Sequence, residues 1–452
     1  MRLASPKYIL ERPDLESVNS DNISNILKND SKFVKKIFSL ANQPKYVYWD
    51  KYKHKPVSGD LTLEEQWMLV SFLRDASAIE TPIKSYPEGN YFKWIRLPNV
   101  DENLHQVDML VGGGLFPKSR IPRGDREIYI SRGVIEEAIA SSQLEGAHTT
   151  RVAAKKMILE KIKPKNKSEQ MIVNNYQAML ALEDDFKTRK LSKSMLFELH
   201  SVLTDKTIDK SEQGRFRRDK DEIVVEGDIG SDTYTSHIPP QESFLDIEIE
   251  RLILYANDEL QNKFVHPLIK AIFLHFWVGY LHPFTDGNGR LARALFYWYL
   301  LKKDYWTFSY IPISTLIKKS PVQYAMAYIY TEQDREDLTY FFDYQMRKIS
   351  QAIADFGEYL TKQSSQNHQV EQIVSNEIVL NDRQRQLIFY FLSESNASTT
   401  TGSHATLNNV SRQTAAKDLS TLFDNKLIKS KKDGKYVRYY ASDRLKKLSA
   451  PN

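Results

Sequence analysis

The chain has 452 residues, of which 41% are hydrophobic and 27% are charged. These proportions are typical of globular proteins and exclude a collagen-like or wholly disordered chain, and the length corresponds to about three domains. Because the chain contains no cysteine, disulfides, thiolate nucleophiles and thiolate metal sites are excluded. Any chemistry must therefore use histidine, carboxylate or hydroxyl groups.

The net charge of +5 is unevenly distributed along the chain. From Asn381 onward there are 13 Lys or Arg and 6 Asp or Glu, so that the last 72 residues carry +7 and the preceding 380 carry −2. A basic C-terminal segment favours an anionic partner there, such as nucleic acid. The sequence shows no signal peptide and no membrane-spanning run, so we expect a cytoplasmic protein without a membrane partner.

The first part of the chain is predicted to be a helical region over residues 1–110. In the segment 61–77, apolar residues recur at helical spacing and place Leu63, Trp67 and Val70 roughly on one face. This pattern predicts an amphipathic helix that packs on a core.

A second helix is predicted over residues 131–146, after a glycine-rich break at residues 112–114. Ser131 is its candidate N-cap, and Gly146 follows its last turn, where glycine commonly ends a helix. From there to residue 350 the pattern is mainly helical.

Two stretches interrupt this helical pattern. Residues 222–225 and 233–237 are strand-like, flank a Gly/Asp-rich turn and are followed by two prolines, which predicts a β-hairpin. The polar stretch 361–369 predicts a linker or a helix end, and residues 351–380 are expected to form a linker or a connecting helix.

The string HPFTDGNGRLAR, His282–Arg293, lies between two strongly apolar helical segments. Its glycines permit a tight loop at positive φ, with a helix beginning directly afterwards. Consecutive backbone N–H groups in this loop, together with the positive end of the helix dipole, would form an anion cradle. Arg290 and Arg293 are three residues apart and share a helical face, where both guanidinium groups can hold the oxygens of a polyphosphate.

Two further side chains of this string suit chemistry on a phosphate. Asp286 offers a hard oxygen ligand of the kind that Mg²⁺ prefers beside phosphate oxygens. His282, four residues earlier, is the titratable group of the string that can exchange a proton near pH 7. We expect His282 to deprotonate an incoming hydroxyl, a role worth about 10²–10⁴-fold in rate.

The whole string resembles the Fic family motif HxFx(D/E)GNGRxxR, and every fixed position is matched. The resemblance covers about residues 110 to 345 and implies a mainly α-helical domain that transfers AMP from Mg-ATP to a protein hydroxyl. It implies that His282 is the general base, Asp286 the Mg²⁺ ligand and Phe284 a core anchor. The nucleotide-binding residues of the string are then Asp286, Gly287, Asn288, Gly289, Arg290 and Arg293.

The upstream string SSQLEG resembles the inhibitory motif (S/T)xxxE(G/N) that precedes many Fic domains. Ser141 and Glu145 are four residues apart on one helical face. A carboxylate at a helix C-terminus is disfavoured by the helix dipole and should pair with a cation. The resemblance implies that Glu145 pairs with Arg293 and blocks productive placement of the ATP γ-phosphate. Alternatively, Glu145 positions a water for removing AMP from a modified protein.

The predicted hairpin precedes the motif by about fifty residues, where Fic proteins resemble one another in having a flap beside the active site. An exposed strand edge there can align a target segment by β-augmentation and bring its hydroxyl near His282. The alternative is a plain surface hairpin.

The last domain, residues 381–452, is predicted to contain two helices and a hairpin, an order that resembles the winged helix-turn-helix. A loop is expected at 393–406, Ser411 is the candidate N-cap of the second helix, and strands are expected at 427–431 and 436–440 around an Asp-Gly turn. Side chains suited to phosphate contacts with DNA are Arg412, Gln413, Lys417, Lys431, Lys432, Lys435 and Arg438. Alternatively, the domain docks a protein, which includes a second copy of the chain in a homodimer.

The sequence thus predicts a mainly α protein with a Fic-type helical domain, its β-hairpin flap and a C-terminal winged-helix domain. Domains are expected at 1–110, 111–350 and 381–452, joined by 351–380. The expected activity is autoinhibited transfer of AMP from Mg-ATP to a hydroxyl of a target protein or of the chain itself. The alternatives are a nucleotide-sensing DNA-binding regulator with little turnover, and a Fic enzyme that uses another donor or removes AMP.

Overall fold

The structure is a computed structural model of the chain. The residues it describes are 5–16, 18–56, 59–111, 126–229, 231–260, 263–374, 378–394, 397–434 and 436–448. Helices dominate, and the strands form three small antiparallel sheets, so the fold is mainly α as predicted. Across these ranges, no helix combines the length and apolarity needed to cross a lipid bilayer.

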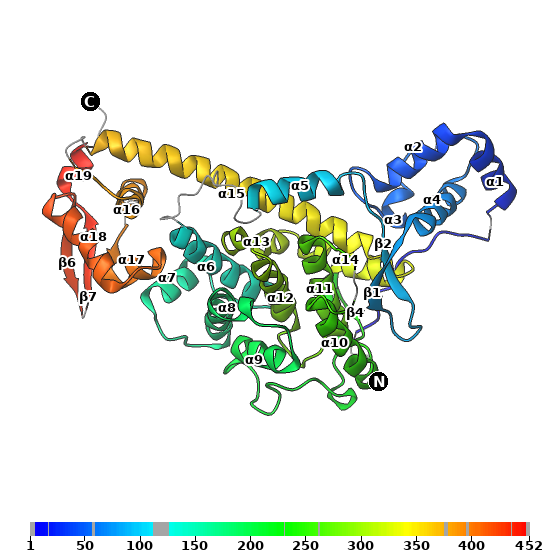
Figure 1. Ribbon diagram of the computed structural model, residues 1–452, viewed down its shortest axis with the longest axis horizontal. Coiled ribbons are helices and arrows are strands. Elements are labelled where there is room, and N and C mark those ends of the chain that lie inside the picture. The colour runs from blue at the N-terminus through cyan, green and yellow to red at the C-terminus, as the bar shows by residue number, and fades with distance from the viewer. Residues whose placement is uncertain are drawn as a thin grey trace.

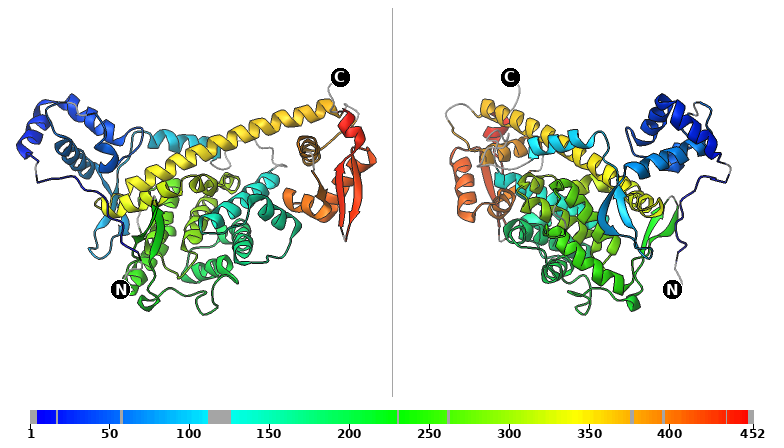
Figure 2. Two further views of the ribbon diagram at one scale, coloured as in Figure 1. Left: turned by 180° about the vertical axis from the view of Figure 1, so that it is seen from behind. Right: turned by 45° about the vertical axis from the view of Figure 1, so that its right-hand side comes forward.

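One long helix, α15 (Thr339–Ile373), runs along the molecule (Figure 1). The N-terminal helices lie near one of its ends and the C-terminal elements near the other (Figures 1 and 2). The polar stretch 361–369 lies inside α15 and is neither a linker nor a helix end. Phe341 anchors one end of the helix in the main core, and Val370 anchors the other in the C-terminal core. The polar stretch between them is therefore held in the helix from both sides.

The N-terminal region contains helices and one hairpin. Its elements are α1 (Ser20–Asn29), α2 (Ser31–Asn42), α3 (Trp49–Tyr52), α4 (Leu63–Ser77), β1 (Ile79–Lys84), β2 (Tyr91–Trp94) and α5 (Val100–Val111). The helix predicted at 61–77 is confirmed as α4, and a capping box between Thr62 and Glu65 fixes its start. The hairpin β1–β2 was not predicted, and its Phe92 and Trp94 pack into the main core.

The central region is a helical bundle. Its helices are α6 (Arg126–Leu144), α7 (Arg151–Glu160), α8 (Lys167–Asp184), α9 (Lys193–Thr204), α10 (Glu242–Ala256), α11 (Pro267–Leu281), α12 (Asn288–Lys302), α13 (Ile313–Lys318) and α14 (Pro321–Gln333), with short 3-10 turns η2 (Phe186–Thr188), η3 (Asp219–Asp221) and η4 (Trp306–Tyr310). The paired helices α11 and α12 are buried along nearly their whole length. Large buried side chains such as Trp277 and Trp298 fix the position of the loop between them.

The helix predicted at 131–146 is longer at its N-terminus than expected. It begins at Arg126, so Ser131 lies inside α6 and is not its N-cap. The residues just before Ser131 include no glycine or proline, and nothing in them ends a helix. The glycine-rich break at 112–114 lies outside the described residues.

The predicted hairpin is present but begins later along the chain. Its strands are β3 (Val225–Ile229) and β4 (Asp232–His237), which pair in antiparallel fashion. The prediction started the first strand at residue 222, which is wrong, because Glu222 adopts a left-handed conformation at φ 47° that ends η3. A left-handed residue interrupts the extended backbone of a strand.

The C-terminal region contains helices and a three-stranded sheet of order β5-β7-β6. Its elements are α16 (Asp382–Ser393), β5 (Thr399–Thr400), α17 (Thr401–Asn408), α18 (Arg412–Asp424), β6 (Ile428–Asp433), β7 (Tyr436–Ala441) and α19 (Asp443–Leu448). The loop predicted at 393–406 instead holds β5 and α17. Thr400 caps α17 by accepting a hydrogen bond from the Ser403 N–H, so polar residues here start a helix.

The second helix and the hairpin of this region agree closely with the prediction. Ser411 caps α18 by accepting a hydrogen bond from the Thr414 N–H at 3.0 Å. Arg412, Gln413 and Lys417 are exposed, as expected. Asp433 pairs with Tyr436, so the turn of the hairpin lies one residue later than predicted. Lys435, a predicted phosphate contact, lies outside the described residues.

Candidate active site

The loop of the motif joins α11 to α12 through two left-handed residues. His282 follows α11 at φ 46°, and Gly287 precedes α12 at φ 84°, a conformation that glycine adopts without strain. Asn288 fixes the loop, since its Nδ2 donates to the Phe284 carbonyl oxygen at 2.8 Å and its Oδ1 accepts from the Phe284 N–H at 2.9 Å. The Asn288 side chain thus shapes the loop and leaves its backbone to the expected anion cradle.

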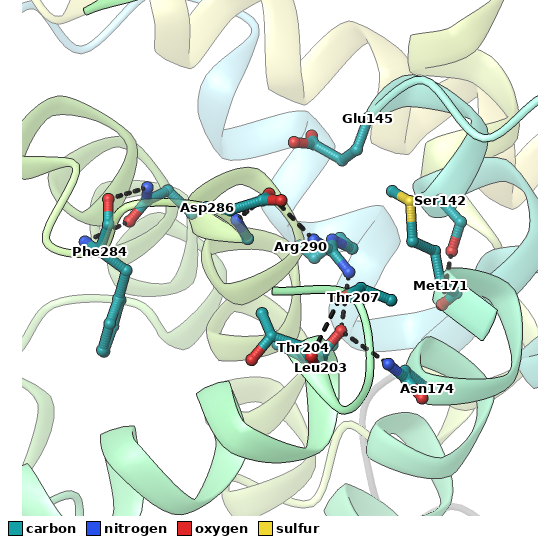
Figure 3. A network of polar contacts seen from close by, with 12 residues as sticks. Ser142, Glu145, Met171, Asn174, Leu203, Thr204, Thr207, Phe284, Asp286 and Arg290 are labelled. Carbon is teal, nitrogen blue, oxygen red and sulfur yellow. Dashed lines mark hydrogen bonds and ion pairs between the residues drawn. The ribbon is translucent and has the colours of Figure 1, made fainter. Parts of the chain in front are cut away.

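The first motif arginine lies beneath the loop. Arg290 is fully buried, donates to the Leu203 carbonyl oxygen at 2.7 Å and donates to Asp286 Oδ1 at 3.1 Å, as Figure 3 shows. The sequence favoured two guanidinium groups that both face the phosphates. The structure instead uses the Arg290 side chain to tie the loop to the end of α9.

A histidine that the sequence did not single out supports the same loop. His200, on α9, stacks on the Phe284 ring at 3.7 Å between centroids, and its Nε2 lies 3.0 Å from the Asp286 carbonyl oxygen. Burial lowers the pKa of His200 to about 4, so its neutral ring donates to that carbonyl. Phe284 is fully buried, as expected of a core anchor.

The candidate general base lies at the end of α11. His282 Nδ1 lies 3.3 Å from the Gly279 carbonyl oxygen, and an Nδ1–H that donates there leaves Nε2 free to accept a proton. Burial, followed by the nearby His237, lowers the pKa of His282 to about 4. The ring is therefore neutral at pH 7, the state that a base requires.

A second residue that the sequence analysis left without a role fixes the backbone at His282. Arg217 is buried, and its Nε donates to the His282 carbonyl oxygen at 2.7 Å. Its Nη2 donates to the Pro240 carbonyl oxygen at 2.5 Å, and its own N–H donates to the Pro283 carbonyl oxygen at 2.8 Å. Arg217 is therefore a positioning residue for the start of the motif.

The second motif arginine pairs with the helix that precedes the domain. Arg293 Nη2 donates to Glu145 Oε1 at 2.9 Å, and its Nε donates to Ser141 Oγ at 2.8 Å. Burial alone would lower the pKa of Arg293, but the Glu145 carboxylate and the other neighbouring groups raise it above its usual value. The structure thus brings together Ser141, Glu145 and Arg293, three residues that the sequence had proposed to act together.

The Glu145 carboxylate lies over the first turn of α12. A Cβ added to Gly289 would fall inside contact distance of the Glu145 carboxylate oxygens. Figure 3 shows the Glu145 side chain extending toward the loop that holds Asp286 and Arg290. An acidic group thus occupies the space above a helix N-terminus, where an anion would otherwise bind.

The position of α6, which leads to Glu145, is fixed by another buried carboxylate. Glu137 accepts hydrogen bonds from the Ser314 N–H at 3.0 Å and from the Tyr297 hydroxyl at 2.8 Å. Burial raises the pKa of Glu137. These bonds hold α6 against α12 and α13, so Glu145 is presented from a rigid support.

Asp286, the expected Mg²⁺ ligand, has only one of its two carboxylate oxygens engaged in short contacts. Its Oδ1 accepts from the Gly287 N–H at 2.5 Å and from Arg290, whereas Lys167 Nζ lies 3.8 Å from its Oδ2. The Asp286 side chain is 38% exposed, and within the described ranges its Oδ2 takes part only in this long contact with Lys167. Among the described residues, no three His, Asp or Glu side chains gather into a protein cage for a metal. A single carboxylate fits Mg²⁺, which takes one or two carboxylates together with phosphate oxygens and water.

Sequence comparison agrees with this geometry. A sequence model of the Fic/DOC family matches residues 190–300, a range that includes the hairpin β3–β4, α11 and the loop of the motif. The chain therefore contains a Fic domain that includes these residues.

Curated relatives and solved structures carry the same family name. The chain is 28% identical over 189 residues to the protein adenylyltransferase Fic of Culex quinquefasciatus, covering 41% of this chain and 34% of that protein. It is 34% identical over 110 residues to the protein adenylyltransferase Fic of Drosophila mojavensis, covering 24% of this chain and 19% of that protein. The chain thus spans 34% or less of the length of these relatives. A Fic family protein from Desulfovibrio desulfuricans G20 aligns over 77% of this chain and 97% of that one, with 19% identity and a TM-score of 0.46.

Proposed function

We propose that the chain is an autoinhibited protein adenylyltransferase that transfers AMP from Mg-ATP to a hydroxyl side chain of a target protein or of itself. The observation that carries the proposal is the ordered loop between His282 and Arg293. It combines a neutral histidine with free Nε2, the N-terminus of α12 and the partly exposed Asp286 carboxylate. The relatives named protein adenylyltransferase Fic support the same reaction.

The proposed reaction is an in-line displacement at the α-phosphorus of ATP. The target hydroxyl oxygen forms a bond to that phosphorus, the bond to the bridging oxygen of the β-phosphate breaks, and pyrophosphate leaves. His282 Nε2 takes the hydroxyl proton. The backbone N–H groups from Gly287 to Gly289 and the α12 dipole stabilise the charge on the phosphate oxygens. Mg²⁺ bound at Asp286 would neutralise phosphate charge.

Autoinhibition is proposed from the position of Glu145. Its carboxylate pairs with Arg293 and covers Gly289, so a phosphate entering the cradle meets a like charge and loses a guanidinium partner. Removal of the Glu145 carboxylate should release Arg293 from its ion pair and uncover Gly289. This proposal assigns Ser141 a supporting role, because it accepts a hydrogen bond from the same arginine.

Nucleotide labelled at the α-phosphate tests the reaction, the base and the inhibitor together. We expect Glu145→Gly to raise self-labelling and to tighten ATP binding about tenfold, which corresponds to about 1.4 kcal/mol. His282→Ala in the Glu145→Gly background should abolish labelling while ATP binding persists. ATP labelled at the γ-phosphate should label neither variant, because pyrophosphate leaves.

A matched control uses another glutamate of α6. Glu136 is paired with Arg151 at 2.5 Å, and this pair is no part of the loop around Gly289. Glu136→Ala removes a carboxylate from the same helix and should leave labelling at the wild-type level. Equal labelling by Glu145→Gly and Glu136→Ala would show that Glu145 is not the inhibitor.

The same experiment separates the proposed enzyme from its alternatives within the family. Labelling by UTP in place of ATP would identify another donor, because the cradle contacts phosphates rather than bases. Loss of AMP from a labelled target on addition of wild-type chain, but not of Glu145→Gly, would indicate that Glu145 positions water for removal of AMP.

We further infer that residues 381–452 form a winged-helix module, joined by α15 to the Fic domain at 111–350 and the N-terminal region at 1–110. Exposed Arg412 and Lys417 on α18 support phosphate contacts with DNA. Arg438 does not, since it pairs with Glu160 on α7 at 3.0 Å and with Asp433.

This module also gives the second candidate function a specific basis. The helix α17 packs on α6 and α7, beside the support of Glu145. A nucleotide-sensing regulator that binds DNA with little turnover would use this contact. This second candidate function predicts salt-dependent DNA binding, and it predicts that neither Glu145→Gly nor wild type is labelled by α-labelled ATP. A module that docks protein or forms a homodimer instead predicts a change of oligomeric state, without DNA affinity, when its outer face is altered.

A further inference from the structure

The last carbonyl oxygens of α11 are held by side chains. A helix leaves these oxygens without backbone partners. In α11 the Gly279 carbonyl oxygen lies 3.3 Å from His282 Nδ1, and the Tyr280 carbonyl oxygen lies 2.7 Å from His237 Nε2. Arg217 donates to the next two carbonyl oxygens along the chain, at 3.2 and 2.7 Å. The end of the helix is therefore capped by the proposed base together with two further side chains.

Both ring nitrogens of His237, the last residue of β4, face acceptors. Nε2 faces the Tyr280 carbonyl oxygen, and Nδ1 lies 2.7 Å from Oε2 of Glu332 on α14. A carbonyl oxygen and an ionised carboxylate can only accept, so both bonds form when each nitrogen carries a hydrogen. The His237 side chain is 8% exposed and that of Glu332 is 19% exposed, so little water competes for these bonds. The contacts therefore require the doubly protonated ring.

The surroundings of His237 suit a positive charge. The C-terminus of a helix carries a partial negative charge that stabilises a nearby cation. Burial opposes any charge, but the Glu332 carboxylate and the helix end supply the opposite charge and the hydrogen bonds that a buried cation needs. His237 and the Arg217 guanidinium thus place two positive groups around the last turn of α11.

The proposed base shares this helix end. The charged groups that act on the His282 ring are His237 at the end of β4, Arg217 just before η3 and Glu145 at the end of α6. Burial lowers the pKa of His282 to about 4, and His237 and then Arg217 act in the same direction. The Gly279 carbonyl and Glu145 act in the opposite direction. Among the charged neighbours, His237 therefore has the largest influence on the base.

We propose that His237 is a positioning residue for the proposed base. Glu332 holds His237 in its doubly protonated form, and that form caps α11 and keeps His282 Nε2 unprotonated. The effect on reaction rate rests on the proposed adenylyl transfer, whereas the protonation of the two rings does not. As a consequence, transfer should persist in mildly acidic solution, where a histidine that titrates near 6.5 would already be protonated.

The ¹⁵N signals of histidine rings test the state of His237 in the full chain. The two signals are assigned by their absence from His237→Gln, and we expect both nitrogens to carry hydrogen at pH 7. Glu332→Gln removes the charge that holds Nδ1–H, so one nitrogen should then be unprotonated at pH 7. A His237 ring that has an unprotonated nitrogen in wild type at pH 7 overturns the proposal.

Glu336→Gln is the matched control for Glu332→Gln. It removes the same charge four residues later, and Glu336 is joined to β2 through its backbone, since its carbonyl oxygen accepts from the Lys93 N–H at 2.9 Å. We expect Glu336→Gln to leave both His237 nitrogens protonated. Equal loss of hydrogen in the two variants would show that Glu332 does not hold the ring.

Titration of the His282 ring measures the effect on the base without any reaction. His237→Gln keeps an N–H that can donate to the Tyr280 carbonyl oxygen but removes the positive charge. We expect the ¹³Cε1 signal of His282 to titrate about one pH unit higher in His237→Gln than in wild type, because a neighbouring like charge disfavours the protonated ring. An unchanged titration overturns the proposal.

The pH dependence of labelling tests the role in transfer. In the Glu145→Gly background, His237→Gln should leave self-labelling by α-labelled ATP at pH 8 and the KM for ATP nearly unchanged, and should move the acid limb of the profile up by about one pH unit. His237→Ala should also lower the rate at pH 8 about tenfold, because the Tyr280 carbonyl oxygen loses its donor and the base is less well placed. Equal losses at every pH in His237→Gln, or equal rates of both variants at pH 8, would refute this role.

The outcomes separate this inference from the proposed function. If Glu145→Gly shows no transfer of AMP but the His282 titration moves as expected, the enzyme assignment fails and the coupling of the two histidines stands. If Glu145→Gly is active and His237→Gln leaves its pH profile unchanged, the role of His237 is refuted and the enzyme assignment stands.

Discussion

The two sides of the first turn of α12 are built in different ways. Below the turn, Arg290 donates to the Leu203 carbonyl oxygen and His200 donates to the Asp286 carbonyl oxygen. We call these two side chains the floor. Above it, the Glu145 carboxylate meets Arg293 through a side-chain ion pair, and Arg293 also donates to the hydroxyl and to the backbone carbonyl oxygen of Ser141. We call these three residues the cover. The floor is buried, whereas the Glu145 side chain is 26% exposed.

The difference shows how one loop can be both rigid and regulated. Backbone acceptors cannot leave without local unfolding, so the floor keeps the cradle in one shape. A side-chain carboxylate at the end of α6 can rotate away at the cost of one ion pair. We therefore expect changes in the floor to act on stability and changes in the cover to act on ligand binding.

The largest expected effect comes from the floor arginine. Arg290→Met removes a fully buried guanidinium and leaves the Leu203 carbonyl oxygen without that donor. We expect a loss of about 3–5 kcal/mol in the free energy of unfolding, the range for breaking a buried pair. Urea denaturation followed by circular dichroism measures it. A loss below about 1 kcal/mol would contradict the structural role of the floor.

Acid should destabilise the fold through two buried histidines, His200 in the floor and His275 on α11. Burial lowers the pKa of His200 in the floor to about 4, and burial lowers that of His275, near Arg293, to about 3. In the unfolded chain both titrate near 6.5 and bind protons that the folded chain does not. Stability should thus be highest above pH 6.5 and decline toward pH 4, by at most about 1.4 kcal/mol per pH unit for each histidine. Denaturation midpoints at pH 7, 6 and 5 measure this slope, and His275→Phe should reduce it.

A coupled pair of substitutions tests where the cover lies. Gly289→Ala places a methyl group against the Glu145 carboxylate and should cost about 1–3 kcal/mol of stability, as overpacking does. In the Glu145→Gly background the same change should cost nearly nothing. Thermal unfolding of the four proteins of this cycle gives the coupling energy. Additive costs would place Glu145 away from Gly289.

The smallest effect on stability is expected from neutralising the cover. Glu145→Gln keeps the length of the side chain but removes its charge, and the affected ion pair is partly exposed. We expect a change below about 1 kcal/mol in unfolding free energy. Nucleotide affinity should still rise, and calorimetry with ATP would detect it. A large loss of stability with unchanged affinity would make the cover a structural element instead.

The parts of the site that are contiguous in sequence were predictable. Residues His282 to Arg293 form one local string, and the Ser141–Glu145 spacing places both residues on one helical turn. Helix signals such as the cap at Ser411 also depend on neighbouring residues only. For the motif string, the Ser141–Glu145 pair and the Ser411 cap, spacing along the sequence determines where the side chains lie.

The missed residues act over long distances in the chain. His200 and Arg217 contact the loop from 65 to 86 residues away, and local spacing assigned neither of them a role in the site. Arg290 was expected to face the phosphates. Helical spacing predicts the face of the helix on which it lies, but it does not predict that the Leu203 carbonyl oxygen lies below that face and accepts its hydrogen bond.

The first residues of the chain form a pairing that the sequence did not predict. The Tyr8 N–H donates to the Thr235 carbonyl oxygen, and the Thr235 N–H donates to the Pro6 carbonyl oxygen, each at 2.9 Å. The strand formed by Pro6 to Tyr8 thus pairs with β4 through its backbone, which leaves no trace in side-chain pattern.

The pairing of Ser5 with Thr235 has a consequence for how the protein is made. These residues are separated by 230 positions, so a ribosome adding about 5–20 residues per second produces the hairpin on the order of 10–50 s after its partner. The early segment has no pairing partner on β4 during that time. When β4 emerges, a strand is already present to cover it, and the nascent hairpin does not expose an open edge to other newly made chains, where edge-to-edge aggregation would begin.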